Sequence, residues 1–365
     1  PLWYNQEVEG FGTDARVCNL SYLQTDWYIG QMKRPYYNSP ALPISWTAKD
    51  YAPNNNEVAY VRNTKVEEMS VHKAFKWLLN PSPSTKYKGE SYLPTGKLYI
   101  AVDKEEALSS PLFEVGDSVC RFAEDEIDEK MYIRPVRRLI RSEMMVLDMI
   151  QTNQWKRPMY FAVTVGDSYY LGLQKYFELT GLAYQITPVA SENGEPRVNV
   201  EKMYDNMMHK FRFGNMNKRG IYIDENLMRM CRTHRMMFTY LAEELVRQED
   251  YERAVEVLDY AEEQLPGYNI PYDYTSASMA GLYYQSNEIE KGNRMMDEVC
   301  AISADYLRWG LSMDKRDREY IKTVLDRHYY ILGYCLRELN AYGQDELMEK
   351  YEKIWSVYNS TLKRK

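Results

Sequence analysis

Two aspartates, each set just after a predicted strand, are the residues of this sequence best placed to do chemistry. Gln24-Thr25-Asp26-Trp27 follows a strand predicted over 16–23, and Gly166-Asp167-Ser168 follows a strand predicted over 158–165. Ligands of open α/β sheets bind beyond the carboxyl ends of the strands. If these strands are neighbours, both carboxylates face one crevice beside an indole ring, an arrangement suited to holding a sugar. We therefore expect a ligand cleft that contains Asn19, Thr25, Asp26, Trp27, Gly166 and Asp167.

Two other interpretations of these residues stay open. Thr25 and Asp26 are residue types that begin helices, and Gly166-Asp167 is typical of a turn, so all four have a purely structural explanation. Alternatively, Asp26 and Asp167 act as acid and base in a free-standing carbohydrate-active enzyme. That chemistry needs both carboxylates across one cleft, with the pKa of one raised by burial.

The rest of the sequence carries no catalytic motif. It contains no GxGxxG, phosphate-binding loop, HExxH or GxSxG. No histidine has a second one within metal-ligand spacing, and the scattered cysteines indicate neither a zinc site nor a disulfide framework. These residues are His72, His209, His234 and His328, and Cys18, Cys120, Cys231, Cys300 and Cys335. We therefore predict no catalytic residue, no metal and no cofactor in this chain.

Net charge, charge pattern and hydropathy argue against nucleic-acid binding, calcium binding and a membrane-spanning segment. A net charge of −7 argues against a nucleic-acid partner, which requires a basic face. The acidic run 124–129 lacks the glycine that a calcium-binding loop requires. We expect its carboxylates to pair with the arginines near 134–141. The alternative is that those arginines bind an anionic lipid head group. No apolar stretch is long enough to span a bilayer. Because the chain starts at Pro1 with no signal peptide, we expect it to be cut from a longer polypeptide.

The elements that must position these residues alternate in the first half of the chain. Helices are predicted over 25–33, 66–79 and 136–151, and further strands over 57–61, 97–102 and 182–187. Alternation of helices with apolar strands favours a mostly parallel sheet in three layers. We assign this α/β domain to residues 1–195, with a polar turn at 191–196 as linker.

The second domain, residues 196–365, is predicted to be helical. Phe238, Leu241, Ala242 and Leu245 share one helix face, and Ala254, Leu258, Ala261 and Leu265 share another, followed by Pro266-Gly267. This spacing matches the tetratricopeptide pattern. Weaker copies of the pattern follow over 279–299 and 332–354. In the first of them Gly292 takes the position that Ala254 has in the pattern, 38 residues further along the chain. Such repeats stack and bind partners rather than catalyse.

Several blocks of sequence resemble a known family. They are the blocks 1–10, 14–21, 25–28, 157–162 and 179–184, together with the repeat at 235–266. In combination they are similar to the soluble C-terminal region of a bacterial membrane family, a domain of unknown function related to protein O-mannosyltransferases. The resemblance implies a parent of the lipid-linked-sugar glycosyltransferase type, with many membrane helices before Pro1 and its catalytic acid in the membrane part. It also implies a location on the periplasmic face of the inner membrane.

We therefore expect a non-catalytic accessory domain that binds an acceptor or a partner. Its partners would be the upstream transmembrane region of the same polypeptide and an acceptor polypeptide or a glycan. A free-standing enzyme that uses Asp26 and Asp167, and a plain protein–protein scaffold, are the alternatives.

Overall fold

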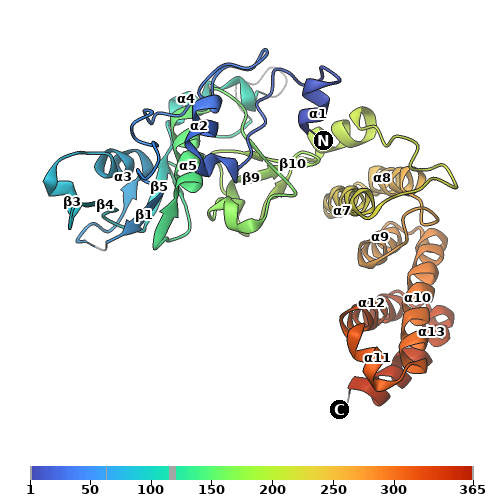
Figure 1. Ribbon diagram of the computed structural model, residues 1–365. Helices are drawn as coiled ribbons and strands as arrows, with labels where there is room; N and C mark the ends of the chain where they lie inside the picture. The colour runs from blue at the N-terminus through green and yellow to red at the C-terminus, as the bar shows by residue number, and fades with distance from the viewer. Residues whose placement is uncertain (1, 63, 115–120, 364–365) are drawn as a thin grey trace. The chain divides into compact units, whose positions relative to one another are not determined.

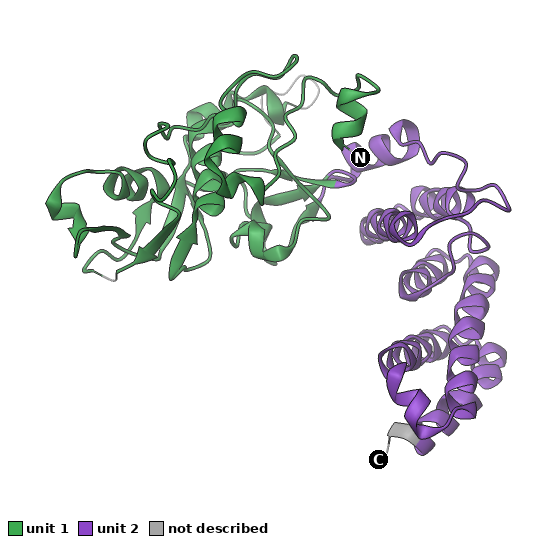
Figure 2. Ribbon diagram, viewed as in Figure 1, with its two compact units in different colours: residues 1–179, 183–197 green, residues 180–182, 198–365 purple. Residues whose placement is uncertain are grey.

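The chain folds into two compact units. In the computed structural model, residues 2–62, 64–114 and 121–363 are described. The first unit comprises residues 1–179 and 183–197, and the second comprises residues 180–182 and 198–365 (Figure 2). We call them the N-terminal unit and the helical unit. The first is α/β and the second is built of helices, as the sequence predicts (Figure 1).

Short elements make up the N-terminal unit. Its strands have two to four residues: β1 (Val58–Val61), β2 (Met69–Ser70), β3 (Lys86–Tyr87), β4 (Glu90–Leu93), β5 (Leu98–Ala101), β6 (Lys130–Tyr132), β7 (Arg138–Ile140), β8 (Tyr160–Ala162), β9 (Phe177–Leu179), β10 (Ala183–Ile186) and β11 (Arg197–Val198). Its helices are α1 (Leu2–Glu7), α2 (Asp26–Met32), α3 (Val71–Leu78), α4 (Lys104–Leu108) and α5 (Arg141–Asn153). A 3₁₀ helix, η1 (Tyr22–Gln24), precedes α2.

The strands form three small sheets in which parallel and antiparallel pairings mix. Their orders are β3-β4-β1-β7, β11-β9-β10-β8 and β2-β5-β6. β1–β4 and β2–β5 pair in parallel, whereas β1–β7, β3–β4, β5–β6, β8–β10 and β9–β10 are antiparallel. The prediction of one mostly parallel sheet in three layers is therefore wrong. Short connections explain the difference: Lys88 and Gly89 join β3 to β4 with positive φ angles of 54° and 86°, a turn that closes an antiparallel hairpin.

The predicted strand over 16–23 is also wrong. The side-chain carbonyl of Asn19 accepts hydrogen bonds from the backbone amides of Ser21 (3.0 Å) and Tyr22 (3.2 Å). A local side-chain bond of this kind closes a turn and competes with extended backbone. The chain therefore enters η1 instead of a sheet, and Asp26 does not follow a strand.

Helix α5 forms the centre of the N-terminal core. Met144, Met145, Leu147 and Ile150 are buried among residues of the surrounding strands and helices. Asp148, on the same helix, is buried and accepts hydrogen bonds from the Ser45 amide (2.7 Å) and hydroxyl (2.6 Å). Burial raises the pKa of this carboxyl. The bonds to Ser45 tie the irregular segment before β1 to the core.

The helical unit consists of helices packed against their neighbours in sequence. They are α6 (Val200–Tyr204), α7 (Glu225–Arg247), α8 (Tyr251–Gln264), α9 (Tyr274–Gln285), α10 (Ile289–Ser312), α11 (Lys315–Tyr320), α12 (Lys322–Ala341) and α13 (Asp345–Tyr358), with π-helical turns Asp205–Lys210 and Asn359–Lys363. α7 packs on α8, α9 on α10, and α12 on α13 (Figure 1). Small residues permit the close approach: Ala242, Ala254 and Ala280 are fully buried.

Candidate ligand site

Aromatic residues from the first 36 positions surround a cavity of about 330 Å³ in the N-terminal unit. Trp3 comes from α1, Tyr22 from η1, Trp27 and Tyr28 from α2, and Tyr36 from the loop that follows α2. Gln6, Glu7, Arg16 and Gln31 supply polar groups to the same walls. We call this cavity the aromatic pocket.

Local hydrogen bonds fix the elements around the aromatic pocket. The Gln6 amide donates to the carbonyls of Gly12 (2.7 Å) and Ala15 (2.9 Å), which folds the segment after α1 back onto that helix. The Glu7 carboxylate accepts hydrogen bonds from the hydroxyls of Tyr36 (2.9 Å) and Tyr37 (2.8 Å). These bonds join α1 to the loop after α2, although about 30 residues separate them in sequence.

Four of the rings keep a large exposed surface, that of Tyr36 (41%) among them. Trp3 is 44%, Tyr22 43% and Trp27 58% exposed. The Trp3 and Tyr22 rings stack with centroids 6.4 Å apart at 18°, and Trp27 lies 5.9 Å from Tyr22 at 49°. Tyr28 is buried beneath them, with an edge contact of 5.5 Å to both Tyr22 and Trp27. Exposed aromatic faces that gather on one side of a pocket indicate a binding surface, because isolated core packing would bury them.

The protonation of the groups near this pocket suits binding rather than nucleophilic chemistry. Burial raises the pKa of Cys18 to about 12 and that of Tyr28 to about 12. The hydrogen bond to Glu7 raises the pKa of Tyr37 to about 12. The Cys18 thiol is therefore protonated at neutral pH, and a protonated thiol is a poor nucleophile. No cluster of three histidine, cysteine or acidic side chains that could hold a metal occurs in the described ranges.

The structure places the residues of the predicted cleft in two separate settings. Trp27 lines the aromatic pocket, and Asn19 and Thr25 lie beside it. The backbone amide of Asn19 donates to the Tyr28 hydroxyl (2.8 Å), and the Thr25 hydroxyl donates to the Tyr22 carbonyl (2.7 Å). Asp26 is in the first turn of α2 and is not among the residues that line the pocket.

Gly166 and Asp167 belong to a different element. Gly166 precedes, and Asp167 begins, a 3₁₀ helix (Asp167–Tyr170) that starts five residues after the end of β8. Neither lines the aromatic pocket. The two aspartates thus do not follow two parallel neighbouring strands, which was the geometric basis of the predicted cleft; a cleft that includes both stays a prediction.

Sequence reasoning missed most of the pocket. It named Trp27, but not Trp3, Tyr36, Arg16 or Glu7. One signal was available, because residues 1–37 contain Trp3, Tyr4, Tyr22, Trp27, Tyr28, Tyr36 and Tyr37. Which of these rings share a wall depends on the turn at Asn19 and on the Glu7 hydrogen bonds, and neither follows from residue spacing.

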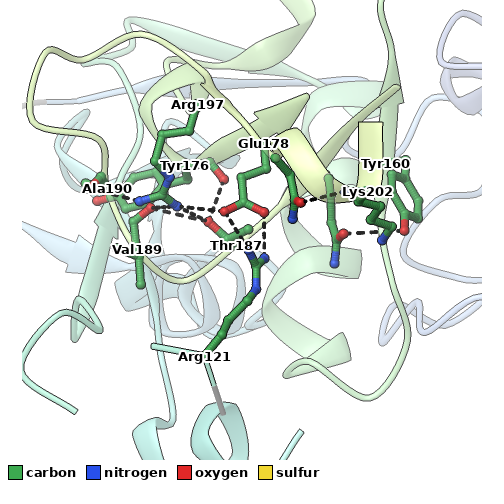
Figure 3. A network of polar contacts seen from close by, with 11 residues as sticks. Arg121, Tyr160, Tyr176, Glu178, Thr187, Val189, Ala190, Arg197 and Lys202 are labelled. Atoms are coloured by element: carbon green, nitrogen blue, oxygen red, sulfur yellow. Dashed lines mark hydrogen bonds and ion pairs between the residues drawn. The ribbon is translucent and has the colours of Figure 1, made fainter. Parts of the chain in front are cut away.

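A second polar cluster in the N-terminal unit is a structural network (Figure 3). The buried Glu178 carboxylate accepts two hydrogen bonds from Arg121, at 3.0 and 2.5 Å, and lies 3.6 Å from Arg197. Arg197 also donates to the Thr187 hydroxyl (2.9 Å) and the Val189 carbonyl (3.0 Å). Because partners within the chain already engage these charged groups, the network offers little to a ligand.

A larger cavity in the helical unit is lined by charged residues, several of which already pair with one another or with a neighbour. Its volume is about 660 Å³, and Asp259, Glu262, Arg294 and Tyr272 are among its lining residues. Arg294 forms a salt bridge with Glu262, and the Tyr272 hydroxyl donates to Glu262 at 2.9 Å. Asp259 is bonded to Lys291 at 2.8 Å. These pairs leave the aromatic pocket as the stronger candidate.

Comparison with known proteins relates the chain to a domain that is associated with a membrane protein family. Within the described residues, no helix combines the length and the apolar character that crossing a bilayer requires. Searches of curated proteins and of solved structures each returned no match. The profile of TMEM260-associated domain 2 matches residues 1–205, more than half of the chain, and this range includes the whole aromatic pocket. The matching description is of a domain associated with a membrane protein family, and it does not name the protein O-mannosyltransferase-like family that the resemblance suggested. The chain belongs to the TMEM260-associated domain 2 family.

Proposed function

We propose that this chain is a non-catalytic, extracytoplasmic accessory domain of a membrane glycosyltransferase related to protein O-mannosyltransferases, and that its aromatic pocket binds a saccharide. The observation that carries the proposal is the grouping of Trp3, Tyr22 and Trp27, each with an exposed face, around one cavity. Aromatic faces bury the apolar C–H faces of sugar rings, while neighbouring amide and carboxylate groups bond the hydroxyls. Gln31 supplies such an amide here, whereas the Gln6 amide and the Glu7 carboxylate are already engaged within the chain.

The family match supports the membrane part of this proposal. A domain associated with a membrane protein family fits a partner in the upstream transmembrane region of the same polypeptide. The resemblance of the sequence blocks to protein O-mannosyltransferase relatives supplies the sugar chemistry and the periplasmic location. Free cysteines are not typical of an oxidising compartment, but Cys231, Cys300 and Cys335 are buried and so shielded from oxidants.

The helical unit gives the proposal its second part, tetratricopeptide-like docking of an acceptor polypeptide. Two observations support this part: α7 packs on α8, α9 on α10 and α12 on α13, and the residues of the tetratricopeptide pattern at 238, 241, 242, 245, 254, 258 and 261 are all buried. A free-standing enzyme that uses Asp26 and Asp167 gains no support, since neither residue lines the aromatic pocket.

The test of saccharide binding is replacement of Trp27 by alanine. We expect the wild-type chain to bind a subset of glycans on an array, and W27A to bind them about three- to tenfold more weakly, as loss of one stacking contact implies. Trp309→Ala is the matched control, because Trp309 is 47% exposed and lies on α10 in the helical unit. Absence of glycan binding by the wild-type chain, or equal losses in W27A and W309A, contradicts the proposal.

A further inference from the structure

Arg16 lines the aromatic pocket with part of its hydrogen-bonding capacity unused. Its Nη2 donates to the Gln31 carbonyl (2.8 Å), and its Nε donates to the Met32 sulfur (3.5 Å). Its Nη1 is buried and has no hydrogen-bond partner. A guanidinium has five N–H groups, so three remain, two on Nη1 and one on Nη2. A buried charged donor without a partner is costly to a folded protein, and its retention calls for an explanation.

The surroundings of Arg16 leave its positive charge uncompensated. Arg16 forms no ion pair with a carboxylate in the part of the chain that the structure describes. The carboxylate in the pocket walls, that of Glu7, accepts the hydroxyls of Tyr36 and Tyr37. A second guanidinium, that of Arg157, lies near Arg16. The pKa of Arg157 is lowered mainly by burial and also by the positive charge of Arg16. Arg157 itself donates to backbone carbonyls and the Ser39 hydroxyl, so it brings no counter-charge.

The position of the guanidinium relative to the rings defines the shape of ligand that would fit. Its Cζ lies 5.1 Å from the centroid of the Tyr36 ring, a cation–π contact that holds the group at the pocket wall. Nη1 is buried, so the unused N–H group on Nη2 is the donor left for a ligand in the pocket. A charged donor of this kind favours an oxygen of a carboxylate or phosphate over a neutral hydroxyl.

From these contacts we propose that the saccharide bound in the aromatic pocket carries an anionic group, a carboxylate or a phosphate, and that Arg16 binds it. This inference rests on the proposed saccharide-binding function. The sugar ring lies against Trp3, Tyr22 and Trp27, and its anionic substituent accepts a hydrogen bond from Nη2 of Arg16 and faces the charge of the guanidinium. Arg16 therefore determines specificity within a pocket whose general affinity comes from the rings.

The experiment compares three otherwise identical oligosaccharides that end in glucose, glucuronate or glucose 6-phosphate. We expect the wild-type chain to bind one or both charged forms about ten- to a hundredfold more tightly than the neutral form, since charge-assisted hydrogen bonds are the strong ones. Isothermal titration calorimetry at low and at moderate salt measures the three affinities. Preference for glucuronate identifies a carboxylate ligand, and preference for glucose 6-phosphate identifies a phosphate ligand.

Two variants of Arg16 separate recognition from folding. Arg16→Gln is expected to abolish the preference for the charged form while binding of the neutral form persists, which also shows that the pocket is folded. Arg16→Lys keeps a positive charge but lacks the planar guanidinium, so it should retain only part of the preference for the charged form. Arg138→Gln, which makes the same change of charge at an exposed position on β7, should leave all three affinities unchanged.

The outcomes distinguish this inference from the function on which it rests. Equal affinity of the wild-type chain for the three oligosaccharides overturns the role of Arg16 but leaves saccharide binding intact. A preference for the charged form that survives in R16Q also overturns it. No binding of any of the three, together with an empty glycan array, refutes the proposed function itself.

Discussion

Arg235 is a buried charge that holds together the turn between two helices of the helical unit. It lies on α7 and is 1% exposed. Its Nη2 donates to the carbonyls of Leu265 and Ile270, both at 2.7 Å, and its Nη1 donates to Pro271 (3.3 Å) and to the Ser276 hydroxyl (3.4 Å). Burial lowers the pKa of this guanidinium. These four acceptors belong to the connection from α8 to α9 and to the first turn of α9.

Replacing Arg235 with methionine keeps an unbranched apolar stem and removes the donors. The two short bonds are each worth about 1.5–3 kcal/mol because the donor is charged, and the two long ones less. Removing the guanidinium also removes the cost of its desolvation, which offsets part of the free energy lost with the hydrogen bonds. However, several carbonyl groups are left buried without a partner, which is unfavourable. We therefore expect R235M to lower the free energy of unfolding of the helical unit by about 3–5 kcal/mol.

Urea denaturation followed by far-ultraviolet circular dichroism measures the change, and hydrogen exchange localises it. Amides of α8 and α9 should exchange faster in R235M than in the wild-type chain. Arg247→Met is the matched control, since Arg247 is on the same helix and forms an exposed salt bridge with Glu244; its loss should cost less than about 1 kcal/mol. A destabilisation of R235M no larger than that of R247M would refute the reasoning.

Two further predictions concern packing and protonation. Gly292→Ala on α10 should destabilise the helical unit by about 1–3 kcal/mol, because the new Cβ would lie 2.5 Å from the Tyr284 ring; Gly30→Ala on α2, where nothing lies within 4 Å, should instead stabilise the chain by about 0.5–1 kcal/mol. Thermal unfolding of both variants checks the opposite signs. Burial, and secondarily the charge of Arg327, lowers the pKa of His328 to about 4 from 6.5, so the unfolded state takes up a proton first as the pH falls. Between pH 6.5 and 4 the free energy of unfolding should therefore fall by about 1–2 kcal/mol, a value reduced because the imidazole is partly exposed, and the corresponding slope should be absent in H328F urea titrations.

Some residues of the candidate site could be identified from the sequence, and others only from tertiary contacts. Trp27 was identifiable from the sequence because it follows the start of α2, and that helix begins after Thr25 as residue type predicts. Arg16 carried no such signal. Arg16 is a candidate because Nη1 of its guanidinium has no hydrogen-bond partner. The absence of a partner can be recognised only from the tertiary structure, which shows all the neighbouring groups.

The sequence alone determined the helical unit because its information is local. Spacing of i, i+3, i+4 and i+7 assigned Phe238, Leu241, Ala242 and Leu245 to one buried face, and all four are buried. Strand pairing in the N-terminal unit is non-local, and strands of two to four residues carry too few side chains to specify a partner or a direction. Only the tertiary structure therefore decided the three small sheets, and only it brought Trp3, Arg16 and Trp27 to one cavity.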